Sequence, residues 1–309
     1  MIVCCGEALI DMLPRQSSTG EPCFAPHAGG AIFNTAIALG RLGVPTGFFS
    51  GLSHDMFGAL LARTLEQSLV GTHYCARSNR PTTLAFVELR DGQASYHFYD
   101  ENSAGRMITE TDLPAFGDDV KALMFGGISL LPEPCASTYE VLMARERSKR
   151  VIMLDPNIRP GFITDEKAYL ERLKRLFALA DIVKLSDEDL NWIGARFGSD
   201  GEALIASLLA DNATLVLVTR GSQGADGYAK SGKTSAVGKP VSVIDTIGAG
   251  DTFNAGVLAS LHRQGLLDRK ALAGISVTQI EQALQLANKV AAVTVSRAGA
   301  NPPWSHELG

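Results

Sequence analysis

The sequence predicts an α/β protein built on a mostly parallel β-sheet with helices on both faces. Short apolar runs, bounded by turn-forming residues, alternate with longer stretches of helical periodicity over the first two thirds of the chain. Such runs are typical of strands buried on both faces, and their alternation with helices is typical of parallel sheets. The chain has 309 residues, enough for one large α/β domain with an appendage.

Six apolar runs are predicted to be strands: Met1–Cys5, Val44–Phe49, Ala122–Phe125, Val151–Leu154, Ile182–Leu185 and Leu215–Thr219. Six stretches among them are predicted to be helices: Phe33–Leu42, Met56–Gln67, Tyr139–Glu146, Glu166–Leu179, Asp187–Phe197 and Gly201–Leu209. The C-terminal third differs, because it shows two further helical stretches, Thr252–Gln264 and Thr278–Ser296, and little strand.

Two segments break the alternation and predict hairpins. Leu9–Phe24 and Thr82–Tyr99 have period-two patterns with turn signals, of which the clearest is Arg90-Asp91-Gly92. Alternation on either side of a turn signal indicates antiparallel strands with one polar face. We expect the two hairpins to form a small accessory sheet.

Composition excludes several function classes. The formal net charge is −5 at pH 7 with scattered Lys and Arg, whereas a nucleic-acid partner calls for a basic face. The five cysteines form no C-x-x-C pair, so we expect reduced thiols rather than disulfides or a zinc site. No apolar stretch is long enough to span a bilayer, and the N-terminus lacks a signal-peptide pattern. We therefore expect a cytoplasmic protein without a membrane partner.

The stretch Asp245–Phe253, D-T-I-G-A-G-D-T-F, carries the strongest chemical signal. Gly248, Ala249 and Gly250 open an apolar helix, where unpaired backbone N–H groups and the helix dipole make an anion site. A carboxylate such as Asp251 would repel a phosphate bound there, so its presence needs a reason. Taking a proton from an attacking hydroxyl is such a reason. Anion stabilisation and a base are the two parts that phosphoryl transfer needs. The alternative is a helix N-cap after a flexible turn.

A second stretch begins with G-G-A-I-F-N. The pair Gly29 and Gly30 permits close approach of the backbone to a ligand, and the amide of Asn34 can meet sugar hydroxyls. By itself this stretch also fits a turn followed by a core helix.

Together with the opening G-E-A-L-I-D, these stretches resemble the ribokinase-like carbohydrate kinase family over essentially the whole chain. The resemblance implies one Rossmann-like kinase domain, residues 1–309, with a β-sheet lid built from insertions at about 12–26 and 82–105. It implies that Asp251 is the catalytic base, with an anion hole formed by Gly248, Ala249 and Gly250. It further implies sugar contacts from beneath, made by Asp11, Gly29, Gly30 and Asn34.

Other matches extend the resemblance to the roof and side of the sugar site. D-P-N-I-R-P, residues 155–160, is similar to the D-x-N-x-R of fructokinases and ketodeoxygluconate kinases. It implies that Arg159 reaches the sugar or the phosphates, against the alternative of an Arg ion-paired at a turn. Phe98 and Tyr99 end a predicted lid strand, where we expect them to cover the sugar unless they are an ordinary strand pair.

The nucleotide side resembles the family in its loop and departs from it at one motif. The loop after Leu215–Thr219 and a residue of the last helix are similar to the family's ATP contacts, which here are Thr219, Gly221, Gly224 and Asn288. We also assign Lys184, Ser186 and Gly250 to this side. The family's N-x-x-E appears as S-x-x-D, so Asp189 is the candidate for supporting Mg²⁺ through water. A K⁺ site is implied at Asp245, Ile247, Thr294 and Gly299.

The sequence therefore predicts an ATP-dependent kinase that phosphorylates a primary hydroxyl of D-fructose, with 2-keto-3-deoxygluconate kinase, ribokinase and nucleoside kinases as alternatives. The intact Asp251 disfavours a catalytically silent sugar- or nucleotide-binding protein. A dehydrogenase and a P-loop kinase are unsupported, because neither G-x-G-x-x-G after the first strand nor G-x-x-x-x-G-K-[ST] occurs. The family resemblance also suggests a homodimer that pairs through the lid.

Overall fold

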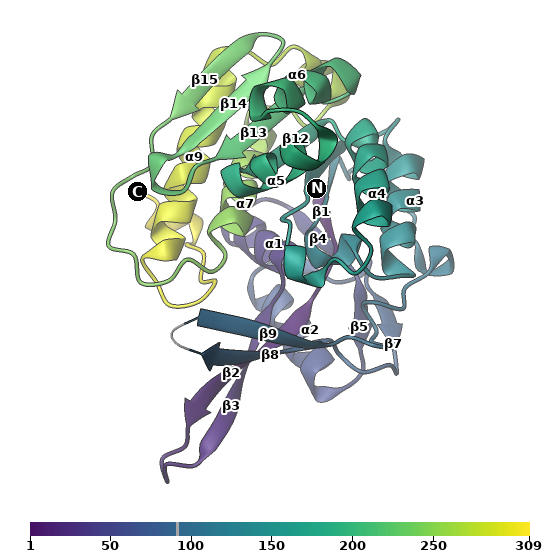
Figure 1. Cartoon of the computed structure of the whole chain (residues 1–309), viewed down its shortest axis with the longest axis vertical. Helices are drawn as coiled ribbons and strands as arrows, with labels where there is room; N and C mark the ends of the chain where they lie inside the picture. The colour runs from purple at the N-terminus through teal and green to yellow at the C-terminus, as the bar shows by residue number, and fades with distance from the viewer. Residues whose placement is uncertain (91–92) are drawn as a thin grey trace.

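A computed structural model describes residues 1–90 and 93–309, and its main body is a nine-stranded sheet (Figure 1). The strand order is β15-β14-β13-β12-β11-β10-β1-β4-β6. The bounds are β1 (Ile2–Cys5), β4 (Thr46–Phe49), β6 (Val70–Gly71), β10 (Ala122–Gly126), β11 (Val151–Asp155), β12 (Ile182–Ser186), β13 (Leu215–Thr219), β14 (Ala225–Ala229) and β15 (Gly232–Ala236). Pairing is parallel from β6 to β13 and antiparallel from β13 to β15. The predicted strands and the mostly parallel sheet are confirmed.

The hairpin of β14 and β15 corrects the expectation of little strand in the C-terminal third. Its sequence has few β-branched residues, so propensity alone gives a weak signal. Pairing with β13 and packing against a helix stabilise it instead. At Gly227, an added side chain would collide with Ile280 of that helix.

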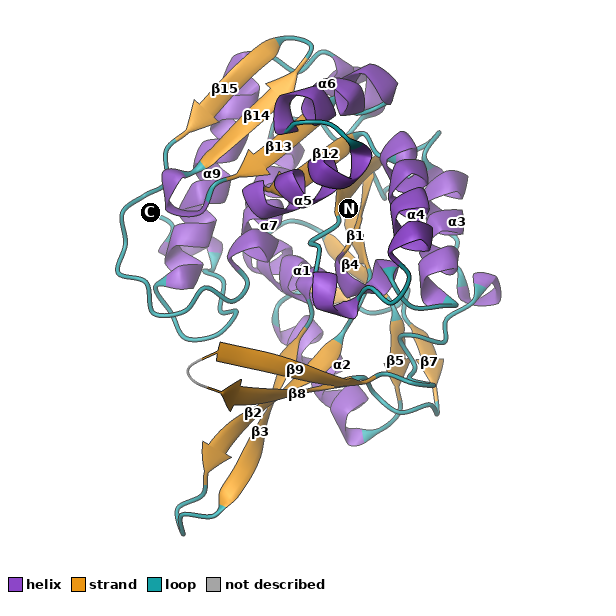
Figure 2. Cartoon of the chain, in the orientation of Figure 1, coloured by secondary structure: helices purple, strands orange, loops and turns teal. Residues whose placement is uncertain are grey.

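Helices cover both faces of the sheet (Figure 2). One face carries α1 (Ala31–Arg41), α2 (Met56–Gln67), α7 (Ala249–Arg263), α8 (Arg269–Ala273) and α9 (Val277–Val295). The other carries α3 (Cys135–Glu146), α4 (Glu166–Leu179), α5 (Asp187–Phe197) and α6 (Gly201–Asp211). Short 3₁₀ turns are η1 (Glu110–Asp112), η2 (Gly127–Leu130), η3 (Pro160–Phe162), η4 (Gly221–Gln223) and η5 (Ser305–Glu307).

Strand β1 shows why the sheet needs helices on both sides. Ile2 and Cys4 point into one hydrophobic core, whereas Val3 and Cys5 point into the other. A strand with alternate residues buried on opposite faces reads as a continuous apolar run. The sequence pattern of the strands therefore follows directly from their central position.

A separate four-stranded sheet, which we call the lid, extends from one end of the main body (Figure 2). Its order is β3-β2-β8-β9, with β2 (Leu9–Gln16), β3 (Pro22–Gly29), β8 (Leu84–Arg90) and β9 (Gln93–Tyr99). Both predicted hairpins are present as antiparallel pairs, joined by parallel pairing of β2 with β8. The turn residues Asp91 and Gly92 lie outside the described residues. A third, two-stranded sheet pairs β5 (Gly51–Ser53) with β7 (Ala76–Ser78).

Two further expectations concern cysteines and membranes. All five cysteines are described and all are free thiols, as expected. In the part of the chain that the structure describes, every helix is too short or too polar to cross a bilayer.

Candidate active site

The candidate site lies where the parallel strands end and the lid begins. Asp155 ends β11, Ser186 ends β12 and Thr219 ends β13, with Ser186 and Thr219 facing each other in the register of the sheet. Ligands of open parallel sheets bind at these carboxyl ends. Helices α1 and α7 also contribute, because Asn34 of α1 contacts Asp251 of α7.

The first turn of α7 is built to receive an anion. Gly248 takes a left-handed conformation, φ +78°, and is the N-cap residue, with no side chain capping the helix. Ala249 N–H makes one long hydrogen bond of 3.3 Å to the Thr246 carbonyl. The N–H groups that begin a helix lack intrahelical partners, so this uncapped turn offers donors to a ligand.

Asp251 has the environment of a general base. It is 8% exposed, and its Oδ2 accepts a 2.9 Å hydrogen bond from Asn34 Nδ2. The hydroxyl of Thr35 donates to its backbone carbonyl at 3.0 Å, which fixes α7 against α1. Burial raises the pKa of Asp251 to about 7, although the Asn34 hydrogen bond opposes the rise. A base with a pKa near the working pH is well matched to proton abstraction.

Lys184 lies buried behind this turn rather than at an open nucleotide surface. It is 3% exposed, and its Nζ is 3.0 Å from Asp155 Oδ2. Asn254 Nδ2 donates to the same oxygen at 2.7 Å. Burial lowers the pKa of Lys184, but Asp155 and other carboxylates outweigh it, so the pKa is raised overall. Lys184 is therefore a buried cation.

Asp11 and the glycine pair form the floor beside the lid. Burial raises the pKa of the half-buried Asp11 to about 6. A Cβ added at Gly29 would collide with the Asp11 carboxylate, which would have to turn away from its observed position. Gly30 has a φ of +112°, which other residues rarely adopt, and it packs against the Glu7 carbonyl.

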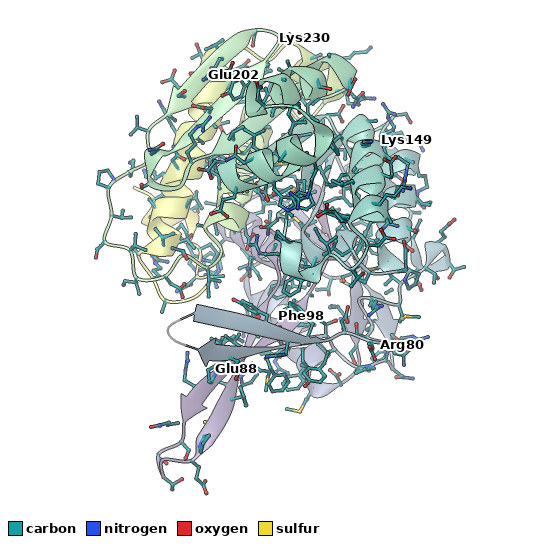
Figure 3. The ribbon with its side chains drawn as sticks, viewed as in Figure 1. Arg80, Glu88, Phe98, Lys149, Glu202 and Lys230 are labelled. Atoms are coloured by element: carbon teal, nitrogen blue, oxygen red, sulfur yellow. The ribbon has the colours of Figure 1, made fainter. Side chains whose placement is uncertain are left out.

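The lid strand β9 presents Phe98, but not Tyr99, to the site. Asp11, Ala85 and Phe98 are direct neighbours across β2, β8 and β9 and so share one face. The ring of Phe98 lies 4.8 Å from that of Phe162 in the main body. Figure 3 shows Phe98 on the side of the lid that faces the main body.

Tyr99 is a correction to the sequence prediction, because adjacent strand residues point to opposite faces. Its ring packs 5.5 Å from Phe86 on the outer face, and Tyr99 is 64% exposed. Tyr96, which was not predicted, lies two residues before Phe98 on the same face of β9, and the two rings stack 6.3 Å apart. Burial raises the pKa of its phenol, and the charges of Asp11 and Arg159 act on it too. Strand alternation from Phe98 would have identified Tyr96.

Arg159 follows β11 and is exposed. Its Nη1 donates to the Ile158 carbonyl at 3.0 Å, and within residues 1–90 and 93–309 it takes part in no ion pair. The alternative of an ion-paired turn residue is therefore not observed. The guanidinium is available to a ligand near Tyr96.

Two of the predicted nucleotide residues, Gly224 and Asn288, meet at the end of β15. Gly224, with φ +99°, packs against the backbone of Ala236. Asn288 Nδ2 donates to the carbonyls of Ala236 at 2.8 Å and Val237 at 3.3 Å. The loop from Thr219 to Gly224 and helix α9 thus meet at one place.

Asp189 has a structural role that weakens the prediction of a metal contact. Its two carboxylate oxygens accept the backbone N–H groups of Ser186, at 3.0 Å, and Ile158, at 2.9 Å. With Ser186 it forms a capping box that begins α5. Over the described residues, no group of three or more His, Cys, Asp or Glu side chains is arranged to hold a metal ion.

The four residues predicted to surround K⁺ belong to segments that meet beside Gly248. Asp245 Oδ1 accepts the Ile247 N–H at 3.0 Å, and its Oδ2 accepts the Gly299 N–H at 2.9 Å. Thr294, the penultimate residue of α9, lies nearby, because the Ile244 and Asp245 N–H groups bond to the carbonyl of the adjacent Val295.

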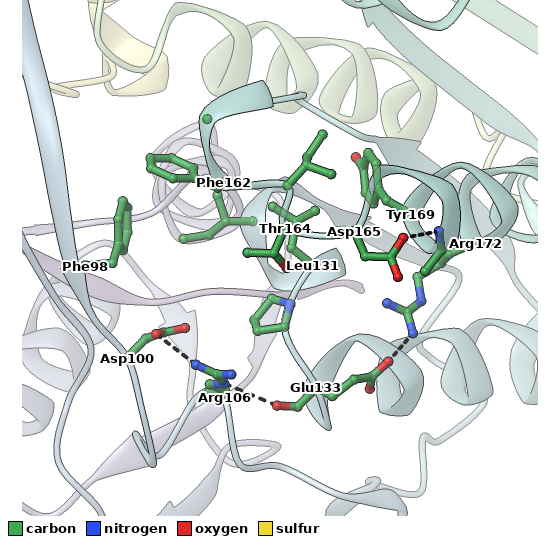
Figure 4. Close-up of a pocket in the computed structure, with 15 residues that line it drawn as sticks. Phe98, Asp100, Arg106, Leu131, Glu133, Phe162, Thr164, Asp165, Tyr169 and Arg172 are labelled. Carbon is green, nitrogen blue, oxygen red and sulfur yellow. Dashed lines mark hydrogen bonds and ion pairs between the residues drawn. The ribbon is translucent and has the colours of Figure 1, made fainter. Parts of the chain in front are cut away.

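A cavity of about 560 Å³ lies beside the roof residues Phe98 and Phe162 (Figure 4). Four charged side chains that line it form ion pairs, Arg106 with Asp100 at 3.1 Å and Arg172 with Glu133, whereas Asp165 caps α4. Neither Asp251 nor Asp11 lines it. It adjoins the candidate site through Phe98.

The fold, the uncapped first turn of α7 and the buried Asp251 are features that suit a phosphotransferase. The model of the pfkB family of carbohydrate kinases matches residues 1–307. The chain belongs to this family and is an ATP-dependent carbohydrate kinase.

Several relatives carry more specific names. A fructokinase of Rhizobium leguminosarum bv. trifolii is 56% identical over 92% of this chain and 86% of its own. A fructokinase of Xylella fastidiosa with bound ATP is 31% identical, with a TM-score of 0.92 over 99% of this chain and 97% of its own.

Two structures of the fructokinase of Vibrio cholerae O395 are also similar. One, with fructose, ADP and a calcium ion, is 27% identical with a TM-score of 0.81 over 97% of this chain and 94% of its own. The other, a double mutant with fructose, ADP and a potassium ion, is 26% identical with a TM-score of 0.82 over 97% and 93%.

Proposed function

We propose that this kinase is a fructokinase, which transfers the γ-phosphate of ATP to a primary hydroxyl of D-fructose. The observation that carries the proposal is Asp251, a buried carboxylate with a pKa near neutrality beside an uncapped helix N-terminus. The names of the relatives support fructose as the acceptor, above all the fructokinase at 56% identity.

The sugar would lie between the floor and the lid. Asp11, Gly29, Gly30 and Asn34 face it from beneath, and Phe98 with Tyr96 covers it. Arg159 supplies a positive charge at its edge. Asp251 takes the proton of the attacking hydroxyl as the N–H groups of Gly248, Ala249 and Gly250 stabilise charge on the phosphoryl group.

ATP would lie along the loop from Thr219 to Gly224, with Ser186 and Asn288 at its edges. Mg²⁺ would enter with the phosphates and neutralise part of their charge, since it usually keeps several waters and few protein ligands. Because the carboxylate of Asp189 is engaged by backbone N–H groups, it can make at most a water-mediated contact to Mg²⁺.

We assign the enzyme to the cytoplasm, where ATP and reduced thiols occur together. We treat residues 1–309 as one kinase domain with the lid inserted.

A coupled assay across D-fructose, D-ribose, 2-keto-3-deoxygluconate and adenosine tests the acceptor. We expect kcat/KM to be highest for fructose, by about tenfold or more, because placement of a single hydroxyl in a hydrogen-bonding site decides such discrimination. A higher kcat/KM for ketodeoxygluconate would reject fructose and leave the kinase class standing.

We also propose a monovalent-cation site that prefers K⁺, formed by Asp245 with the carbonyls near Ile247, Thr294 and Gly299. A neighbouring solved fructokinase contains a potassium ion, which supports the proposal. Because this loop leads into Gly248, an ion there would order the anion-binding turn. We expect several-fold higher kcat in KCl than in tetramethylammonium chloride at equal ionic strength. Equal rates in the two salts would reject the site.

The lid supports the proposal of a homodimer. Strand β3 is an edge strand, and Phe24 on it is 48% exposed with its ring 5.0 Å from Phe86. An open edge beside exposed aromatic rings invites pairing with a second lid. We expect light scattering to give a dimer mass that Phe24→Asp reduces to a monomer mass. A monomeric wild type at micromolar concentration would contradict this.

A further inference from the structure

Lys184 is a buried cation whose position neither the fold nor nucleotide binding explains. It stands on β12, one of the central strands, and is 3% exposed. Its Nζ makes one hydrogen bond among the described residues, to Asp155 Oδ2 at 3.0 Å. An ammonium group carries three donors, so the remaining donors have no acceptor within hydrogen-bonding distance among residues 1–90 and 93–309. A buried charge that is partly unpaired lowers the stability of the fold, which indicates a functional reason for this lysine.

The ammonium lies against the first turn of α7. A side chain added at Gly250 would place its Cβ 3.2 Å from Lys184 Nζ. Gly250 does not have a positive φ, so its backbone conformation does not demand a glycine. Beyond the adjoining residues of α7, Lys184 Nζ is the only atom within 4 Å of that Cβ position in the part of the chain that the structure describes. The charge thus lies next to the N–H groups that face the transferred phosphoryl group.

A second unpaired group lies in the same cluster. Asn254, one turn after Asp251 on α7, is 1% exposed and donates to Asp155 at 2.7 Å. Its Oδ1 is buried and has no partner within the described residues. Asp155 therefore holds Lys184 from one side and α7 from the other.

We propose that Lys184 is a positioning residue for phosphoryl transfer, which holds a positive charge against the Gly248–Gly250 turn and Asp251. This inference rests on Asp251 being the base, and it holds for whichever sugar the enzyme phosphorylates. It replaces the assignment of Lys184 as a nucleotide contact.

The charges around Asp251 show what Lys184 does there. Asn34 of α1 and Lys184 of β12 lower the pKa of Asp251, whereas Asp155 of β11 and Glu7 after β1 raise it. Lys184 is the cation in this set. Its removal would leave the two carboxylates unopposed and raise the pKa of Asp251 further. Removal of Asp155 would act in the opposite direction.

The two members of the ion pair therefore make opposite predictions for the pH–rate profile. We expect the acid limb of kcat/KM to move to higher pH in Lys184→Met and to lower pH in Asp155→Asn. In the double variant, which has no unpaired charge, the limb returns toward its wild-type position. At pH values above the limb, kcat stays about 10²-fold low in Lys184→Met and in the double variant, because both lack the positive charge next to the Gly248–Gly250 turn.

Arg269→Met is the matched control. Arg269 pairs at 2.9 Å with the buried Asp181, which precedes the same strand at its opposite end. We expect this variant to lose thermal stability with an unchanged pH limb and kcat. All variants are assayed with the sugar that the wild type turns over, and ATP affinity is measured by calorimetry.

Three results would overturn the proposal. The first is a kcat of the double variant that equals the wild-type kcat at pH values above the acid limb. This measurement stays informative if Lys184→Met fails to fold. The second is a shift of both single variants in the same direction. The third is a loss of ATP affinity in Lys184→Met as large as its loss of kcat, which would restore the nucleotide contact.

Discussion

Asp251→Asn is expected to lower kcat by about 10³-fold or more and to change ATP affinity by no more than a few-fold, since loss of a general base typically costs about 10²–10⁴ in rate. The amide keeps the size of the side chain and its contact with Asn34. It cannot accept a proton from the sugar hydroxyl. Single-turnover kinetics and calorimetric ATP titration measure the two quantities separately.

The pH dependence of the same variant gives an independent check. Because the pKa of Asp251 is raised to about 7, wild-type kcat/KM should increase with pH and level off above that value. Any residual activity of Asp251→Asn should lack this limb.

The raised pKa also means that ionised Asp251 destabilises the fold. Stability is therefore lost as pH rises through the folded pKa, and the variant should melt higher than wild type at about pH 8.

Asp200→Asn supplies the control for helix capping. Asp200 is the N-cap of α6 and accepts the Ala203 N–H, and Asn caps about as well as Asp. We expect unchanged kcat and melting temperature. If Asp251→Asn keeps half of the wild-type kcat, Asp251 is an N-terminal helix residue and not the base.

The fold could be predicted because its strong signals are local. The strand Leu215–Thr219 and the helices Met56–Gln67 and Glu166–Leu179 have the predicted bounds, as their apolar periodicity and capping residues coincide. The hairpin of β14 and β15 escaped because tertiary packing stabilises it. Its residues Ala225–Ala229 carry little strand propensity of their own.

Some residues of the candidate site could likewise be predicted from the sequence and others could not. Asp251 and Asn34 could be found because they lie in stretches with a chemical pattern, although they are 217 positions apart and meet only in three dimensions. Tyr99 was predicted to cover the sugar together with Phe98, but adjacent residues of a strand point to opposite faces of the sheet. The motif did not indicate which of the two residues points to the site. The burial of Lys184 could not be predicted, because no pattern tells whether a lysine on a strand turns outward or pairs inside. That choice depends on Asp155 and on the absent side chain of Gly250.

Asp11→Ala is expected to lower kcat/KM for fructose by about 10²-fold, with ATP affinity almost unchanged. The Asp11 carboxylate lies beside Gly29 on the lid face that also carries Phe98. It can accept two sugar hydroxyls in charge-assisted hydrogen bonds, each worth about 1.5–3 kcal/mol when shielded from water. A tenfold change corresponds to about 1.4 kcal/mol, so loss of one such bond or both gives this size of effect.

The pKa and a matched variant separate this role from a structural one. Burial raises the pKa of Asp11 to about 6, so the ionised form that accepts both hydroxyls prevails above that pH. Fructose affinity should therefore fall as pH drops through about 6 in wild type and stay flat in Asp11→Ala. Glu21→Ala, an exposed lid carboxylate, should match wild type throughout. A variant that loses fructose affinity, ATP affinity and melting temperature together would show that Asp11 holds the lid in place instead of the sugar.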